Sequence, residues 1–277
     1  MNDPDPFVHE SASIPAKITA GNPRKDEHER QTVIKAQLFI TCLGENFFSP
    51  VLQDMVRLLE RLGVQCELPE GQTCCGQPLY NSGFQSQTME PARQWLRVFR
   101  RTEGYIVAPS GSCADFVRHR YPELFPQGTR EHAQAVQAAA RTFEFTEFLV
   151  RVLQVQDVGA TFPHRVTYHA ACHILRGLGL RQEPKQLLQA VRGLEFIPLP
   201  EEETCCGFGG IFSVVYPEVS RAMMENKVRN IEASGAQVVV VSEPGCLMNI
   251  AGGLAKIGSP VRAMHLIQIL ASNGGAP

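Results

Sequence analysis

The stretches Thr73-Cys74-Cys75-Gly76 and Thr204-Cys205-Cys206-Gly207 repeat one another at an offset of 131 residues in a chain of 277. Two further cysteine pairs keep nearly the same offset, because Cys42 matches Cys172 and Cys113 matches Cys246. Similar segments at a fixed offset indicate duplicated structural units, and two Cys-Cys-Gly triplets are not expected by chance in this composition. The sequence therefore predicts two copies of one unit, which together contain eight of the nine cysteines.

Strands alternate with helices around these cysteines. In the first copy the pattern predicts strands over 36–41, 64–68 and 105–108, and helices over 49–63 and from Pro91 to Gly104. In the second copy it predicts strands over 165–169, 195–199 and 237–242, and helices over 184–191 and 217–234, the last with Val219 on its apolar face. Such alternation is typical of a parallel sheet. We therefore expect an α/β fold of two pseudo-symmetric repeats, each a small, mostly parallel sheet flanked by helices, with cysteines at the strand carboxyl ends.

The expected domain boundaries follow from the repeat. Residues 34–155 form the first predicted domain and residues 156–277 the second. Residues 1–33 lack hydrophobic periodicity and are rich in Pro, Asp, Lys and Glu, which predicts a flexible tail. A predicted helix over 146–154 connects the two domains.

Composition excludes several classes of protein. The 26 basic and 28 acidic residues give a net charge of -2, which does not indicate a nucleic-acid surface. No apolar run approaches the roughly 18 residues of a transmembrane segment. The amino terminus is acidic and broken by proline, unlike a secretory signal, so we expect a cytoplasmic protein. Nine cysteines in a reducing compartment indicate metal or redox chemistry.

The repeated cysteines are expected to form two metal sites, because the carboxyl ends of parallel strands meet at one edge of a sheet. We call Cys42, Cys74, Cys75 and Cys113 the first quartet, and Cys172, Cys205, Cys206 and Cys246 the second quartet. Four thiolates select iron–sulfur clusters or zinc. The chain lacks the C-x-x-C knuckle typical of structural zinc, which favours iron–sulfur, with zinc as the alternative metal. Each quartet is expected in its own pocket, whereas Cys66, whose counterpart is Ile197, is expected to pack in the core.

Other residues near the quartets are candidates for a supporting role. The glycines adjacent to the cysteines allow backbone N–H groups to approach sulfur, or simply form tight turns; they are Gly76, Gly207, Gly209 and Gly210. His169 and His173 flank Cys172 and would bind metal or, as we favour, donate hydrogen bonds to cluster sulfurs. Arg176 would offset cluster charge or stay solvated. The sequence contains no nicotinamide or phosphate-loop motif, and it identifies no catalytic residue.

These residues resemble the cysteine-rich CCG domain, which occurs twice in one of the subunits of heterodisulfide reductase and in the lactate utilization protein A family. The resemblance covers about residues 36–272. It is most extended in Tyr168-His-Ala-Ala-Cys-His173, Leu175-Arg-Gly-Leu-Gly179, Thr204-Cys-Cys-Gly-Phe-Gly-Gly210 and Ser242-Glu-Pro-Gly-Cys-Leu-Met-Asn-Ile250, which look like lactate utilization protein A.

The resemblance implies up to two clusters per chain. Heterodisulfide reductase relatives end the motif in C-x-x-C, which gives five cysteines and a noncubane cluster. Here Ser110 and Glu243 occupy the additional positions, so four thiolates remain in each half, as a [4Fe–4S] cube requires.

The resemblance also implies an iron–sulfur oxidoreductase subunit that transfers electrons in a complex oxidising L-lactate to pyruvate. Its expected partners are a ferredoxin-like iron–sulfur subunit and a third lactate-utilization subunit. The alternatives are a catalytic iron–sulfur oxidoreductase of heterodisulfide-reductase type and a zinc-binding structural module.

Overall fold

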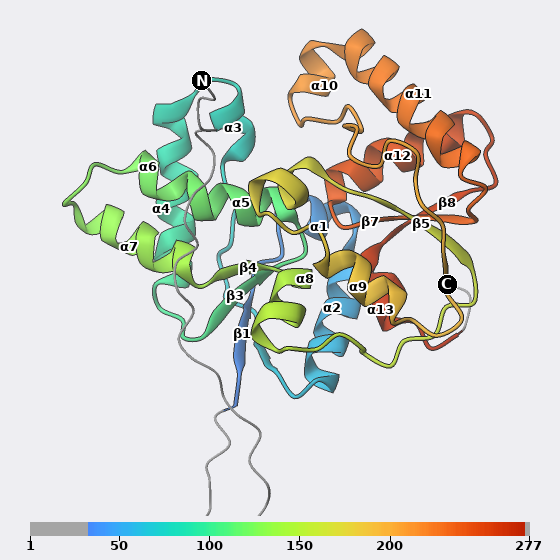
Figure 1. The fold of residues 1–277 in the computed structure, drawn as a ribbon. Helices are drawn as coiled ribbons and strands as arrows, with labels where there is room; N and C mark the ends of the chain where they lie inside the picture. The colour runs from blue at the N-terminus through green and yellow to red at the C-terminus, as the bar shows by residue number, and fades with distance from the viewer. Residues whose placement is uncertain (1–32, 275–277) are drawn as a thin grey trace, which may run out of the picture. The chain divides into compact units, whose positions relative to one another are not determined.

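The computed structural model describes residues 33–274, so the expected tail lies, apart from Val33, outside the described residues. The fold contains two four-stranded sheets, both entirely parallel (Figure 1). We call residues 35–152 the first half and residues 165–271 the second half. The strands of the first half are β1 (Lys35–Leu38), β2 (Gln65–Glu67), β3 (Tyr105–Ala108) and β4 (Thr142–Glu144). Those of the second half are β5 (Arg165–His169), β6 (Glu195–Phe196), β7 (Val238–Val241) and β8 (Arg262–His265).

The two sheets have the same topology. Their orders are β2-β1-β3-β4 and β6-β5-β7-β8, so each strand of the first half has a counterpart in the second. This confirms the predicted α/β fold of two repeated parallel sheets with flanking helices.

Most of the helices also follow the repeat, although the first half has two more helices between β3 and β4 than the second half has between β7 and β8. The first half contains α1 (Cys42–Phe47), α2 (Ser49–Arg61), α3 (Gln77–Asn81), α4 (Gln85–Phe99), α5 (Gly111–His119), α6 (Tyr121–Leu124), α7 (Arg130–Ala140), α8 (Phe145–Glu147) and the π-helical turn η1 (Phe148–Val152). The second half contains the π-helical turn η2 (His173–Gly177), α9 (Glu183–Gln189), α10 (Phe212–Val215), α11 (Pro217–Ala233), α12 (Pro244–Lys256) and α13 (Leu266–Ala271). Within residues 33–274, no helix is both long and apolar enough to cross a membrane.

Three local predictions differ from the structure. Helix α4 begins at Gln85, so Pro91 lies inside it, where the missing proline N–H leaves only the Gln87 carbonyl without its helical donor. Strands β4 and β8 were not predicted, because neither Thr142–Glu144 nor Arg262–His265 contains the apolar run that marked the predicted strands. Val219 is exposed, because the first turn of α11 extends beyond the surface that buries Val228 and Ile231.

Helices pack across the boundary between the halves in two symmetric pairs. Helix α8 follows β4 and packs on α9 of the second half, and α13 follows β8 and packs on α2 of the first half (Figure 1). Helix α5 similarly packs on η2, and α12 on α1. Both hydrophobic clusters of the core consequently contain residues from both halves. Each half thus supplies part of the surface that buries the other.

Glycine permits the closest of these contacts. A Cβ at Gly111 of α5 would lie 2.1 Å from a side-chain carbon of Ile174 in η2. A Cβ at Gly177, at the end of η2, would lie 2.4 Å from the carboxylate of Asp115 in α5. Since real Cβ contacts are never this short, α5 and η2 approach one another only with glycine at both positions.

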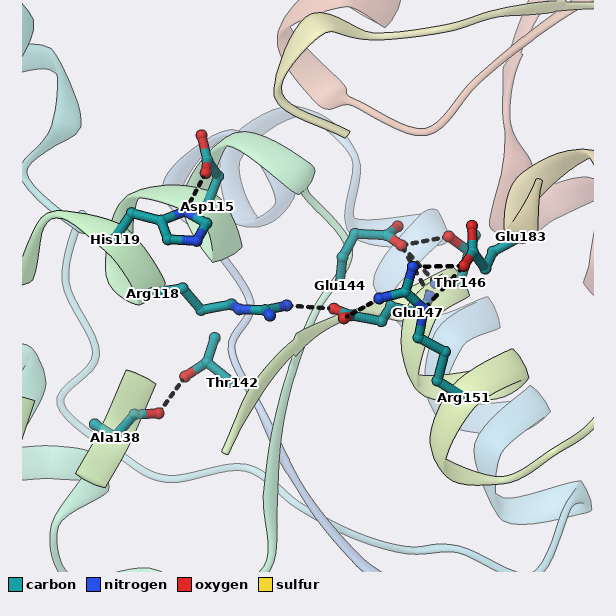
Figure 2. Close-up of polar contacts among 10 residues, drawn as sticks. All are labelled: Asp115, Arg118, His119, Ala138, Thr142, Glu144, Thr146, Glu147, Arg151 and Glu183. Atoms are coloured by element: carbon teal, nitrogen blue, oxygen red, sulfur yellow. Dashed lines mark hydrogen bonds and ion pairs between the residues drawn. The ribbon is translucent and has the colours of Figure 1, made fainter. Parts of the chain in front are cut away.

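A buried ion-pair chain also joins the halves (Figure 2). Glu147, whose side chain is 2% exposed, accepts a bond from Arg118 of α5 at 2.6 Å and pairs with Arg151 at 3.3 Å. Arg151 also pairs with Glu183 of α9 at 2.6 Å. A buried carboxylate requires such partners to offset its lost hydration. The residues predicted as a connecting helix therefore contribute charged contacts to both halves.

His265 links α13 to the first half and makes stability depend on pH. Its Nδ1 accepts a bond from the Ile267 N–H, and its Nε2 lies 3.1 Å from the Pro109 carbonyl oxygen. Burial lowers the pKa of His265 to about 4, so below about pH 6.5 the unfolded chain binds a proton that the folded chain excludes.

We expect the free energy of unfolding to fall between pH 6.5 and pH 4, with His265 contributing about 3 kcal/mol of the loss. His265→Asn preserves a helix-capping side chain and removes the titration, so its pH dependence should be flatter. Chemical denaturation of the iron-free chain at several pH values measures both slopes. Parallel slopes for wild type and variant would contradict the assignment.

Candidate metal centre

All eight repeated cysteines lie just beyond the carboxyl ends of strands. Cys42 opens α1 after β1, and Cys113 lies in the first turn of α5 after β3. The equivalent positions of the second half are Cys172, directly before η2, and Cys246, in the first turn of α12. The Cys74-Cys75 and Cys205-Cys206 pairs lie on the loops that follow β2 and β6. The loops bring together residues that are far apart in the sequence.

The thiols of the first quartet are in contact with one another. The Sγ atoms of Cys42 and Cys74 are 3.8 Å apart, as are those of Cys75 and Cys113. Hydrogen bonds from the thiols of Cys42 and Cys75 lower the pKa of Cys74 to about 3. The bond to Cys74 conversely raises the pKa of Cys42. One sulfur of the quartet is therefore already stabilised as a thiolate.

The second quartet repeats this arrangement. The Sγ atoms of Cys206 and Cys246 are 3.1 Å apart. Hydrogen bonds from Cys172 and Cys206 lower the pKa of Cys205 to about 2, and the Gly207 N–H donates to the same sulfur at 3.3 Å. In each quartet two cysteines are buried and two are partly exposed, and the partly exposed ones occupy equivalent positions: Cys42, Cys74, Cys172 and Cys205.

Both quartets line one cavity, of about 220 Å³. The expectation of a separate pocket in each half is therefore wrong. The cross-half contacts of α5 with η2 and of α12 with α1 explain the difference, since these four segments carry or adjoin Cys113, Cys172, Cys246 and Cys42.

Ser110 and Glu243, the two positions without the additional cysteine, bond to one another across this cavity. The Glu243 carboxylate accepts bonds from the Ser110 hydroxyl at 3.1 Å and from the Ser112 N–H at 2.8 Å. The Ser112 hydroxyl donates a further bond at 3.1 Å. All three residues line the cavity. Sequence reasoning identified Ser110 and Glu243 only as missing ligands and did not predict that they hold the halves together.

The predicted glycines lie beside the quartets. Gly76 and Gly207 have positive φ angles of 91° and 86°, and their N–H groups bond to Cys74 and Cys205, lowering the pKa of those thiols. A Cβ at Gly207 would lie 2.4 Å from the Ser220 carbonyl oxygen, so the close packing of this loop on α11 requires glycine. Gly209 and Gly210 line the cavity.

The structure places His173, Arg176 and Cys66 in three different environments. His173 lines the cavity and its Nδ1 lies 2.6 Å from the Asp115 carboxylate of α5, which is a further polar contact between the halves. Against the effect of burial, this contact raises the pKa of His173. Arg176 is exposed and donates to the Glu203 carbonyl oxygen at 3.2 Å. Cys66 lies in β2, away from both quartets, and packs against a hydrophobic cluster, as predicted.

His169 is 1% exposed, and its ring nitrogens make no hydrogen bond of good geometry within residues 33–274, although a weak contact with the Glu202 backbone affects the pKa of the ring. One of its nitrogens lies within 4.8 Å of the sulfurs of Cys206 and Cys246. Burial lowers the pKa of His169 to about 3, which keeps the imidazole neutral.

Lys227 of α11 is fully buried, and its ammonium donates to the carbonyl oxygens of Glu201 and Glu202, on the loop before Cys205. Sequence reasoning missed Lys227. The available signal was its spacing of four residues from both Met223 and Ile231, which places a charged residue on the apolar face of the helix.

The residues fit an iron–sulfur cluster at each quartet. All nine cysteines are free thiols, and eight of them converge on one cavity in two groups of four. A [4Fe–4S] cluster requires four thiolates, and its negative charge is stabilised by backbone N–H groups such as those of Gly76 and Gly207. The same donor set also suits zinc, which binds four thiolates tetrahedrally.

Glu243 is expected to stabilise the association of the halves. Glu243→Ala removes the acceptor of three hydrogen bonds and should lower the free energy of unfolding by about 3 kcal/mol, because the Ser112 N–H stays buried without a partner. Glu243→Gln keeps one side-chain oxygen and should lose less. Urea denaturation measures both, with Glu225→Ala on the exposed face of α11 as the control. A loss at Glu243→Ala no larger than that at Glu225→Ala would contradict this role.

Comparisons with known proteins also identify two cysteine-rich repeats in this chain. The family model described as "Cysteine-rich domain" (CCG) matches residues 36–118 and again residues 166–251. A crystal structure of a hypothetical protein from Helicobacter pylori shares the fold, with a TM-score of 0.58 at 12% identity over 87% of this chain and 49% of that chain.

Curated relatives are much more similar in sequence. Lactate utilization protein A from Geobacillus kaustophilus is 45% identical over 86% of this chain and 98% of its own length. Lactate utilization protein A from Bacillus licheniformis is 45% identical over 86% of this chain and 100% of its own length. With two matches to the cysteine-rich domain and nearly full-length similarity to these relatives, the chain belongs to the lactate utilization protein A family.

Proposed function

We propose that this chain is the iron–sulfur electron-transfer subunit of a complex that oxidises L-lactate to pyruvate. The observation that carries the proposal is the convergence of eight free thiols, in two groups of four, on one cavity. The lactate substrate is proposed from the curated relatives, which are named for lactate utilization. The proposed complex contains a ferredoxin-like iron–sulfur subunit and a third lactate-utilization subunit, and acts in the cytoplasm.

In this proposal each quartet holds one [4Fe–4S] cluster. The clusters supply one-electron transfer, which thiols and backbone alone cannot provide. The Cys74 and Cys205 sulfurs, whose pKa values are lowered to about 3 and about 2, are ready to bind iron as thiolates. The Gly207 N–H stabilises the charge of the Cys205 sulfur.

Burial of half of each quartet protects the site and leaves one side accessible. Cys75, Cys113, Cys206 and Cys246 are buried, which limits the access of water to that side of each cluster. The partly exposed cysteines Cys42, Cys74, Cys172 and Cys205 mark the side from which a redox partner would approach. A division of labour among subunits agrees with the absence of a nicotinamide or phosphate-loop motif from the sequence.

The metal content tests the quartets as ligand sets. Protein purified without oxygen should contain about eight iron and eight sulfide per chain. Cys205→Ala should retain about four of each, because it removes one ligand of the second quartet only. Cys66→Ala is the matched control: it also removes a half-buried thiol, but one outside both quartets, and should retain the wild-type content. A colourless protein containing zinc in place of iron would reject the proposal.

Reconstitution with the proposed partner subunits tests whether this chain transfers electrons within the complex. The complete complex should couple L-lactate oxidation to reduction of an artificial dye, and the chain alone should show no turnover. Complex containing Cys205→Ala should lose dye reduction, whereas Cys66→Ala should retain it. Lactate turnover by the isolated chain would instead indicate that one cluster is itself catalytic.

A further inference from the structure

The two quartets lie against different buried side chains. In the first half Phe39 and Trp95 are fully buried and pack edge to face, with ring centroids 5.4 Å apart. The corresponding positions of the second half are His169 and Lys227, both also buried. An apolar aromatic pair is thus replaced by an imidazole and an ammonium.

The correspondence follows from the structure of the repeat. Leu38 of β1 pairs with Val107, and Tyr168 of β5 pairs with Val240, so the residues that follow, Phe39 and His169, occupy equivalent positions. For the helices, a Cβ at Gly76 would meet Thr88 of α4, and one at Gly207 would meet Ser220 of α11. Counting seven residues along each helix from these contacts leads to Trp95 and Lys227.

The Lys227 ammonium acts on the second quartet. It is bound by the carbonyl oxygens of Glu201 and Glu202, at 2.7 and 3.2 Å, and no carboxylate pairs with it among the described residues. The ammonium interacts electrostatically with Cys206, Cys205 and Cys246 of the second quartet, and also with the Glu201 carboxylate. Burial of a positive charge favours any additional negative charge nearby, because little water screens the attraction.

His169 adds a second difference. Its neutral ring provides an N–H donor for a cluster sulfur beside Cys206 and Cys246. Such a hydrogen bond raises the reduction potential of an iron–sulfur cluster. Phe39, the counterpart in the first half, provides no donor.

The remaining buried charges at the cavity do not distinguish the two quartets. The Glu243 carboxylate is held by Ser110 and Ser112, beside Cys113, and precedes Cys246 by three residues, so its negative charge lies between the quartets. Asp115 is paired with His173, so that a negative and a positive group lie together between the halves.

We propose that the buried Lys227 and His169 make the second quartet the site of higher reduction potential, so that an electron entering the chain passes from the first quartet to the second. The proposal rests on the function proposed above, because it requires a cluster at each quartet. In this step one electron leaves the reduced first cluster and enters the oxidised second cluster, and no bond forms or breaks. The shared cavity places the two quartets next to one another for this transfer.

The test is an anaerobic redox titration of the full-length chain, followed by electron paramagnetic resonance. Wild type should show two separate reductions. Lys227→Met should lower the reduced-to-oxidised ratio of the second site at least tenfold at a fixed ambient potential, which is about 59 mV for a one-electron couple. The first site should be unchanged. Lys256→Met removes the same charge from the exposed end of α12 and should leave both reductions at their wild-type potentials.

Two further variants test the direction of electron transfer if Lys227→Met does not fold. Cys42→Ala removes a partly exposed ligand of the first quartet, and the reduction that survives should be the one of higher potential. His169→Phe, which installs the residue of the first half, should lower the potential of the second site and abolish any nitrogen hyperfine coupling from that ring.

The outcomes separate this inference from the proposed function. Protein without iron would overturn both. Two iron–sulfur clusters that titrate together, or survival of the lower-potential reduction in Cys42→Ala, would overturn only the assigned direction of electron transfer. Equal shifts in Lys227→Met and Lys256→Met would show that the buried position of Lys227 has no particular effect, which would also overturn it.

Discussion

The packing of α5 on η2, and of α12 on α1, determines how the two quartets come together at the candidate site. Each of these contacts joins one half of the chain to the other at the carboxyl ends of the strands, where parallel sheets present their loops. Gly111 and Gly177 allow the first contact to be close enough that the two quartets line one cavity. A bulkier residue at either position would separate the segments that carry Cys113 and Cys172. The site therefore depends on an interface, although each quartet belongs to one half.

That interface contains polar groups as well as apolar ones. Glu243 bonds to Ser110 and Ser112, Asp115 to His173, and Glu183 to Arg151. Burial of an unpaired carboxylate is energetically unfavourable. Each of these carboxylates therefore requires its particular partner segment to lie opposite it. Hydrophobic packing between the halves supplies most of the stabilisation, since both core clusters contain residues of both. The polar contacts determine the register in which the two halves meet.

The sequence predicts those parts of the fold that depend on local pattern. Strand β3 has the predicted bounds, because its residues form a local apolar run. Helix α11 ends one residue before its predicted end, because a glycine follows it closely. Strands β4 and β8 were missed because their own residues form no apolar run, so that only their pairing with β3 and β7 identifies them as strands. The repeat predicted which cysteines group together, and the structure places each group in contact. It did not predict that both groups share a cavity, since no local pattern encodes how one half packs on the other.

The two sheets have the same topology, but the side chains buried near the first quartet differ from those buried near the second. The first half shows that Phe39 and Trp95 satisfy the packing requirements of this position, with no polar group except the indole N–H left to accommodate. The second half instead buries an ammonium and an imidazole, and burial of each is unfavourable compared with an apolar side chain of similar size. Lys227 offsets part of this cost through two carbonyl oxygens of the loop before Cys205, whereas His169 makes no hydrogen bond of good geometry in the described part of the chain. Both groups lie near the sulfur atoms of the second quartet, a position that an apolar pair fills in the first half.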